Sequence, residues 1–203
     1  MTLEIVTIEK SPNCAVLTTP TKAIDFPLSQ EIWDIIKEMR LKLEELDGSG
    51  LAANQVGIPL KLCLYQVHAD TLSFREDAVK VVPITTLINP SYTPIPEAGK
   101  FADWEGCFSV TEWLGKVPRY SAILLEARTP EGDWIKERKE GYEARVLQHE
   151  IDHLNGVLII DRLTPECVQG PYPEMLPILR QERIILRQEI LERRKNKGSK
   201  DKS

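Results

Sequence analysis

The residues with most chemical potential lie in the hexapeptide Gln148-His149-Glu150-Ile151-Asp152-His153. On a helix, residues four apart share a face, so His149 and His153 can both reach one metal ion. Glu150 follows the first histidine, where a carboxylate can serve as a general base toward water activated by the metal. The same HExxH pattern also occurs by chance on surface helices, where it is only charge. The hexapeptide alone therefore favours a metal site without excluding a plain surface helix.

The flanking residues predict the helix that such a site needs. Residues 141–147 lead into the hexapeptide, and Asn155-Gly156 is typical of a helix end. A second helix is expected from about Gln30 to Leu46, with Ser29 as its N-cap and an apolar stripe that predicts a core face. A third is expected from about Leu176 to Arg194, after a loop held by prolines.

Strands are expected at residues 61–67, 81–88, 122–128 and 134–139, the last two joined by a turn. Residues 92–99 read as a proline-rich loop, residues 69–80 as a polar connector, and residues 157–160 as a short buried strand. Scattered strands around one central helix indicate an α+β domain rather than a wound parallel sheet.

The composition indicates a globular protein of one domain. The chain has 203 residues, of which 42% are hydrophobic and 28% charged. No apolar run reaches the length of a membrane span, and the first residues do not resemble a signal peptide. The four cysteines show no close pairing, which favours reduced thiols and a cytoplasmic location.

The charge is distributed unevenly along the chain. The formal net charge is −5, but the residues from Arg180 onward include nine Lys or Arg and four Asp or Glu. This end is therefore +5 and the rest of the chain −10. We expect a catalytic part at 1–175, and a C-terminal helix with a basic, disordered tail at 176–203 that belongs to the same domain.

A catalytic metal site usually has three protein ligands, so a third must be found. Cys107 is the best candidate, because Gly106 lets the backbone approach closely and a thiolate binds borderline metals strongly. Glu174 stays possible, and His68 is a weak candidate. Cys14, Cys63 and Cys167 are expected to be ordinary buried residues. A copper electron-transfer site would use the same ligand types but would not explain Glu150.

Three segments together resemble the signature motifs of the peptide deformylases. They are Gly48-Ser49-Gly50-Leu51-Ala52-Ala53-Asn54-Gln55, Glu105-Gly106-Cys107-Phe108-Ser109 and the hexapeptide. The resemblance extends from about residue 12 to residue 163. It implies an α+β fold with antiparallel sheets packed around the central motif-bearing helix, together with an N-terminal and a C-terminal helix.

The resemblance also implies roles for matching residues. Cys107, His149 and His153 would hold one divalent metal ion per chain, with Fe²⁺ expected and Zn²⁺, Ni²⁺ or Co²⁺ as alternatives. Glu150 would act as general base and acid. The Gln55 side chain and the backbone N–H of Phe108 would donate to the oxyanion, and the Gly50 backbone would approach the substrate.

The substrate pocket is expected near the same helix face. Tyr142, Arg145 and Val146 precede His149 by seven, four and three residues and are candidates for a methionine pocket. For Arg145, a salt bridge to Asp103 or Glu105 is an equally good interpretation. The residues expected to contact the substrate are Ser49, Leu51, Glu105, Tyr142, Arg145 and Val146.

Three residues depart from the commonest family pattern. Phe108 replaces the usual leucine, which hardly matters if its backbone N–H is the group that acts. Thr111 and Leu114 stand where many bacterial members have Pro and Arg, which affects expected substrate contacts but not the chemistry. Arg119 does match, and is expected to pair with Glu105.

The sequence thus predicts a deformylase that removes formyl from the N-terminal methionine of new polypeptides and releases formate. The alternatives are an HExxH metallopeptidase that cleaves internal bonds and a non-catalytic ribosome-binding homologue. Arg180, Arg183 and Arg187 lie on one face of the last helix, which is either solvated or docks on the ribosome. No DNA or membrane partner is expected.

Overall fold

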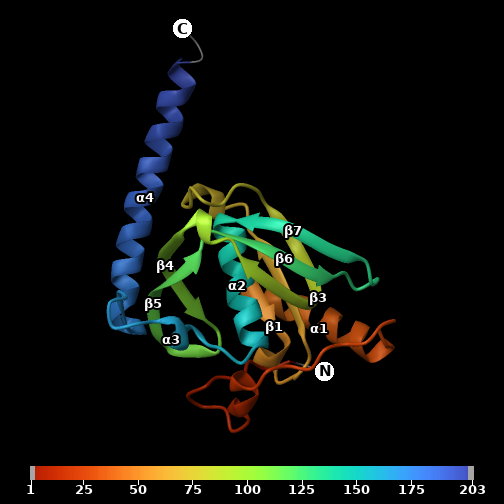
Figure 1. The fold of residues 1–203 in the computed structure, drawn as a ribbon. Helices are drawn as coiled ribbons and strands as arrows, with labels where there is room; N and C mark the ends of the chain where they lie inside the picture. The colour runs from red at the N-terminus through yellow and green to blue at the C-terminus, as the bar shows by residue number, and fades with distance from the viewer. Residues whose placement is uncertain (1–2, 201–203) are drawn as a thin grey trace.

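Two antiparallel sheets and a helix between them form the body of the protein (Figure 1). The computed structural model describes residues 3–200, and only the backbone of residues 194–200. The larger sheet has the order β1-β2-β3-β6-β7 and the smaller one β4-β5-β8. The strands are β1 Gly50–Ala52, β2 Leu62–Val67, β3 Val82–Pro94, β4 Lys100–Cys107, β5 Val110–Tyr120, β6 Ala122–Arg128, β7 Trp134–Glu140 and β8 Gln169–Pro171.

Four α-helices are assigned within the described residues: α1 Gln30–Leu46, α2 Gly141–Leu154, α3 Ile159–Arg162 and α4 Tyr172–Lys200. Short 3-10 helices occupy Cys14–Thr18, Ala53–Val56, Thr71–Ser73 and Pro96–Ala98. The predicted α+β class, with antiparallel sheets around a motif-bearing helix and helices toward both ends, is confirmed.

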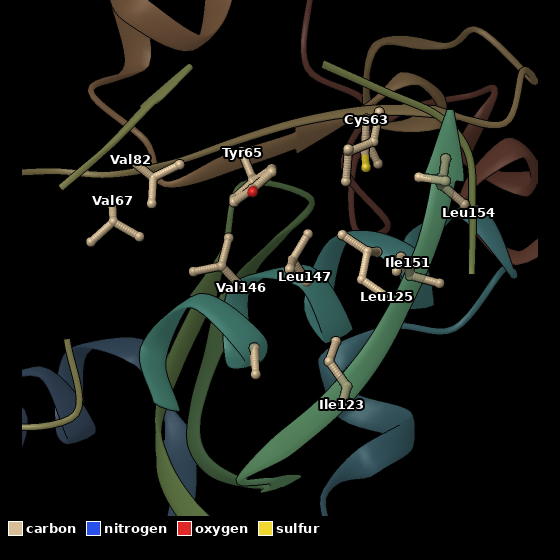
Figure 2. Packing of buried hydrophobic residues seen from close by; sticks show 14 residues of the cluster. Cys63, Tyr65, Val67, Val82, Ile123, Leu125, Val146, Leu147, Ile151 and Leu154 are labelled. Atoms are coloured by element: carbon tan, nitrogen blue, oxygen red, sulfur yellow. The ribbon is translucent and has the colours of Figure 1, made fainter. Parts of the chain in front are cut away.

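Helix α2 is buried against one face of the larger sheet (Figure 2). Leu147 and Ile151 of the helix pack with Cys63 of β2 and with Ile123 and Leu125 of β6 in one apolar cluster. Burying such side chains is the main force that holds a helix on a sheet. The opposite side of α2, which carries His149 and His153, is thereby held in a fixed place.

Alternation along β2 explains why helices cover both faces of the larger sheet. Cys63 and Tyr65 pack in the α2 cluster, whereas Leu62 and Leu64 pack in a second cluster with Met39 and other residues of α1. Helix α1 has the predicted bounds, and the Ser29 side chain accepts a hydrogen bond from the Ile32 N–H as its N-cap.

Strand β3 is longer than predicted. It continues through residues 89–94, part of which the sequence indicated as loop. The pairing register shifts between Ile88 and Ser91, where Asn89 has a positive φ of 51° and its side chain bonds the backbone of Ile24. A bulge of this kind accommodates Pro90, because proline cannot donate a ladder hydrogen bond.

Two further predictions about the C-terminal part were wrong in type or extent. Residues 159–162 form the short helix α3 rather than a strand, because the Asp161 carboxylate accepts a hydrogen bond from the Leu158 N–H at 2.8 Å. Helix α4 begins at Tyr172 and continues to Lys200, past the predicted end at Arg194 and through most of the segment expected to be disordered. Residues 201–203, the end of that segment, lie outside the described residues.

Helix α4 packs against the smaller sheet and near residues 71–73, and its C-terminal end extends beyond the body (Figure 1). Leu179 joins Trp104 and Leu114 in an apolar cluster, and Ile190 is buried. Among the described residues, no helix is both long and apolar enough to cross a membrane.

Candidate metal centre

Three potential metal ligands converge at the face of α2 that points away from the larger sheet. The Sγ atom of Cys107 lies 3.2 Å from Nε2 of His153, and the two histidine Nε2 atoms are 3.2 Å apart. These ligand atoms all lie within 4.8 Å of one another. Helix α2 supplies both imidazoles, and the end of β4 supplies the thiol. The three residues named as ligands from the sequence are therefore brought together, whereas His68 and Glu174 lie outside the cluster.

Of the three cysteines predicted to be buried, two are only partly buried. Cys63 is fully buried in the α2 cluster, but Cys14 and Cys167 are partly exposed. All four cysteines are free thiols. None of these three residues belongs to the metal cluster.

The two imidazoles of the cluster have pKa values shifted in opposite directions. Burial lowers the pKa of His153 well below its ordinary value, so this ring is neutral and its Nε2 lone pair is available. The Nδ1 atom of His149 lies 2.9 Å from Oε2 of Glu105. Burial acts to lower the pKa of His149, but its hydrogen bonds with Cys107 and Glu105 outweigh burial and raise that pKa well above its ordinary value. A metal ion would displace the proton from Nε2, while the hydrogen bond to Glu105 keeps a proton on Nδ1.

Glu105 is the centre of a buried ion-pair network. Arg119 donates to both of its carboxylate oxygens at 2.9 Å, and Arg145 donates to Oε1 at 2.7 Å. Burial acts to raise the pKa of Glu105, but Arg119 and the hydrogen bond from His149 outweigh it and hold that pKa well below its usual range. Glu105 is thus a permanent anion that orients His149, and its predicted pairing with Arg119 is present.

The network continues through Asp152, which was not among the predicted site residues. Arg119 also pairs with the Asp152 carboxylate, and Arg162 of α3 donates to the same group at 2.5 and 3.0 Å. Asp152 is buried on α2, where it directly precedes the ligand His153. Removing one member of such a network would leave a buried charge unpaired, which typically costs about 3–5 kcal/mol.

Glu150 is buried beside the metal cluster. Burial raises its pKa to about 7, and its Oε2 atom has no hydrogen-bond partner among the described residues. A carboxyl group with a pKa near neutrality can both accept and return a proton at physiological pH. A cation bound in the cluster would lower this value, because it favours the charged form.

Close approach of two segments explains the glycines of the first motif. A Cβ atom at Gly50 would lie 2.2 Å from Oε1 of Glu150, and one at Gly48 would lie 2.7 Å from the Phe108 ring. Real Cβ atoms essentially never show such contacts. The two glycines therefore leave room for the side chains of Glu150 and Phe108.

Gln55 is held with its amide N–H groups facing the cluster. Its Oε1 atom accepts a hydrogen bond from the Ala52 N–H at 2.8 Å, and its Nε2 atom donates to Ser109 Oγ at 3.3 Å and contacts Cys107 Sγ at 3.7 Å. Phe108 directly follows Cys107 in the two-residue turn between β4 and β5, and lines the same cavity. Both donors named from the sequence therefore border the ligand cluster.

A cavity of about 340 Å³ opens beside the cluster. Most of the residues predicted to contact substrate line it: Ser49, Glu105, Tyr142, Arg145 and Val146. Leu51 does not, because its side chain is fully buried in the cluster beneath α1. Arg145 lines the cavity and donates hydrogen bonds to Glu105 and to the carbonyls of Val117 and Phe101. The predicted salt bridge between Arg145 and Glu105 is therefore present. Neither Thr111 nor Leu114 lines this cavity. The Thr111 N–H donates a hydrogen bond to Glu9, and Leu114 is buried in an apolar cluster with Trp104 and Leu179.

Several residues at the site were missed from the sequence. Asn54 and Gln148 anchor α2 by bonding the carbonyls of His153 and Tyr120, and both stand inside motifs where polar side chains were a signal. Arg75, Tyr172 and Arg183 line the cavity from the connector and from α4. For those three, nothing in the local sequence pattern indicates proximity to the metal cluster.

The antiparallel α+β fold, the Cys/His/His cluster and the adjacent buried carboxyl group define a metal-dependent hydrolase. The chain belongs to the polypeptide deformylase family, whose model matches residues 2–169. It is 37% identical over 171 residues to peptide deformylase 2 of Rickettsia conorii, which covers 83% of this chain and 84% of the relative. It is 40% identical over 149 residues to peptide deformylase 2 of Pseudomonas syringae pv. tomato, covering 73% and 81%.

Solved structures agree with these sequence relationships. Peptide deformylase from Thermotoga maritima matches with a TM-score of 0.68 and 31% identity, covering 81% of this chain and 99% of that one. A class I type b peptide deformylase from Acinetobacter baumannii matches with a TM-score of 0.69 over 80% of this chain and all of the other, at 23% identity, which supports the fold. The family prediction is confirmed, and the comparisons favour neither the peptidase nor the non-catalytic alternative.

Proposed function

We propose that this protein hydrolyses the N-formyl group from the N-terminal formylmethionine of newly made polypeptides and releases formate, in the cytoplasm. The family membership carries the reaction class. The observation that carries the assignment of this site is the convergence of Cys107, His149 and His153 beside the buried carboxyl group of Glu150.

The metal is assigned to Cys107, His149 and His153. Their donor set of one sulfur and two imidazole nitrogens suits a borderline divalent ion such as Fe²⁺, Zn²⁺, Ni²⁺ or Co²⁺. We favour Fe²⁺, as the family resemblance implies. When bound, such an ion would polarise the formyl carbonyl and lower the pKa of a water molecule toward neutrality.

The protein residues supply the proton transfers and the oxyanion donors. Glu150 takes a proton from the attacking water and returns one to the leaving nitrogen, because it lines the cavity and its Oε2 has no hydrogen-bond partner among the described residues. The Gln55 amide and the Phe108 N–H share the negative charge that develops on the formyl oxygen. Removing one such donor typically lowers kcat by about 10²–10³-fold.

Substrate positioning is assigned to β1 and to the cavity. Strand β1 is the edge strand of the larger sheet, so its outer backbone groups can pair with an extended peptide. The backbone around Gly50 and Leu51 would make those contacts, while Val146, Ser49 and Tyr142 line the space for the methionine side chain. A formyl group carries only hydrogen, so a tight site can admit it and exclude acetyl by size.

Parallel assays on formyl-Met-Ala-Ser and acetyl-Met-Ala-Ser test this function. We expect formate from the first peptide and no hydrolysis of the second. Cleavage of internal bonds in unformylated peptides would instead support the metallopeptidase alternative, and inactivity of the metal-loaded protein would support a binding role.

We expect Gly50→Ala to lower kcat by about 10²-fold, the usual contribution of a general base, while the bound metal is kept. The added methyl group would lie 2.2 Å from Oε1 of Glu150 and must displace that carboxylate. The check is kcat on the formylated peptide together with metal content and circular dichroism. Near-normal kcat would show that Glu150 can shift without loss.

We also propose that the basic end of α4 docks on the ribosome. Residues 194–203 include five Lys or Arg and one Asp, and contacts of such residues with phosphates are steeply salt-dependent. The Arg180, Arg183 and Arg187 side chains are all exposed on the same helix, and Arg183 also contacts the Phe74 ring and lines the cavity.

Truncation after Arg193 is the sharpest test of docking, because it spares the buried Ile190 and the ion pair between Arg193 and Glu76. Turnover of a short formylated peptide should be unchanged, whereas sedimentation with ribosomes at low salt should weaken by at least about tenfold. Equal ribosome binding by the truncated and intact proteins would leave α4 as a solvated helix.

A further inference from the structure

Two arginines from outside the motif segments line the cavity of the metal centre. Arg75 lies in the connector between β2 and β3, and Arg183 lies on α4. Helix α4 begins after residue 169, the last one matched by the family model. The contribution of Arg183 to the cavity is therefore a feature of this chain rather than of the matched family region.

The two guanidinium groups differ in how their charges are balanced. Arg75 is buried, pairs with Asp103 at 2.6 Å and with Asp77 at 3.4 Å, and stacks on the Tyr142 ring at 4.3 Å. Arg183 lies 5.1 Å from the Phe74 ring, and no carboxylate of residues 3–193 forms an ion pair with it.

The surroundings of Arg183 disfavour its positive charge. Burial and, next, the charge of Arg75 lower the pKa of Arg183 below its ordinary value, and Asp103 offsets this only in part. The Arg183 side chain is also exposed, so an anion that enters the cavity can reach it and form a charge-assisted hydrogen bond.

The position of the arginines along α2 indicates which part of a substrate they would meet. Arg75 stacks on Tyr142, which precedes His149 by seven residues and is therefore about 10 Å from it along the helix axis. An extended peptide advances by about 3.3–3.6 Å per residue. A peptide whose formyl group lies at the metal ligands would thus present its second or third residue near Arg183.

We propose that Arg183, supported by Arg75, binds a carboxylate of the peptide substrate at the second or third residue, so that this deformylase favours acidic N-terminal sequences. The inference rests on the proposed function. Its chemistry would also fit the free C-terminal carboxylate of a short peptide, so the test must use blocked C-termini.

The experiment compares kcat/KM for four C-terminally amidated peptides at low salt: formyl-Met-Asp-Ala-Ala and formyl-Met-Ala-Asp-Ala, each with its Asn counterpart. Asp and Asn have the same shape, so their ratio isolates the charge. The intact enzyme should favour the Asp peptide of one pair by about threefold to tenfold, mainly through KM, and lose this preference as salt rises. A free-acid form of the Asn peptide separately measures any effect of a C-terminal carboxylate.

Variants of Arg183 and Arg180 show which arginine causes the preference for the Asp peptide. Arg183→Gln should bring the Asp/Asn ratio to about one while kcat/KM for the Asn peptide is kept, and Arg183→Lys should restore part of the ratio. Arg180→Gln is the matched control, because this exposed arginine on α4 does not line the cavity. It should behave as the intact enzyme.

Three results would overturn the inference. A ratio of one in the intact enzyme for both pairs, or a preference for the free-acid peptide alone, excludes a bound side-chain carboxylate. An equal loss for Asp and Asn peptides in Arg183→Gln would show that Arg183 only holds the Phe74 segment in place. Failure of the intact enzyme on all formylated peptides would be recognised separately, because it also contradicts the proposed function.

Discussion

Cys107→Ser is expected to lose most of its bound metal and nearly all hydrolysis. The Sγ atom of Cys107 is the only sulfur in the ligand cluster formed by the described residues, 3.2 Å from Nε2 of His153. A serine hydroxyl is a far weaker ligand for borderline metals than a thiolate. Metal content per chain, measured by elemental analysis after anaerobic purification, checks the first part, and formate release checks the second.

Cys14→Ser and Cys167→Ser are the matched controls for this prediction. Both cysteines are free thiols with partial exposure, and neither belongs to the ligand cluster. These variants should keep full metal content and activity. Full metal occupancy in Cys107→Ser would disprove the assignment of Cys107 as a ligand, whatever the activity of this variant.

Glu150→Gln is expected to keep the metal and the fold but lose at least about 10²-fold in kcat, the scale of a general acid–base group. The amide has nearly the shape of the carboxylate, so the packing against Gly50 is preserved, but it cannot take a proton. The measurement is kcat on a formylated peptide, with metal content determined on the same sample.

The pH dependence provides a second readout for Glu150. In the protein without metal, burial raises the pKa of Glu150 to about 7, and a bound cation would lower it. Activity should therefore fall at acidic pH as Glu150 becomes protonated, and the residual activity of Glu150→Gln should lack this acidic decline. Near-normal turnover by the variant would place the base elsewhere.

The metal cluster and α2 could be predicted from the sequence because their information is local. His149 and His153 are linked by the helical repeat, and Ser29 and the apolar stripe of α1 specify that helix by short-range signals. Cys107 was identifiable through its glycine and the surrounding motif. Its contact with the histidines, however, depends on the long-range packing of β4 against α2.

The parts that were missed depend on tertiary contacts. Residues 157–160 have the apolar character of a strand, but a single cap by Asp161 and the proximity of β5 favour a helical turn. Pro90 of β3 is accommodated by a bulge at Asn89, which has no clear local signature. Arg183 reaches the cavity because α4 packs Leu179 against Trp104, whereas helical periodicity placed this arginine only on a face expected to be solvated or docked on the ribosome.

The most direct test of the central claim is an anaerobic titration of metal-free protein with Fe²⁺, with formate release from formyl-Met-Ala-Ser followed at each step. The structure assigns one ligand cluster, Cys107, His149 and His153, among the described residues. Formate release should therefore rise with bound metal and saturate at one ion per chain, while acetyl-Met-Ala-Ser stays intact throughout. Equal formate release before and after metal addition would contradict the account.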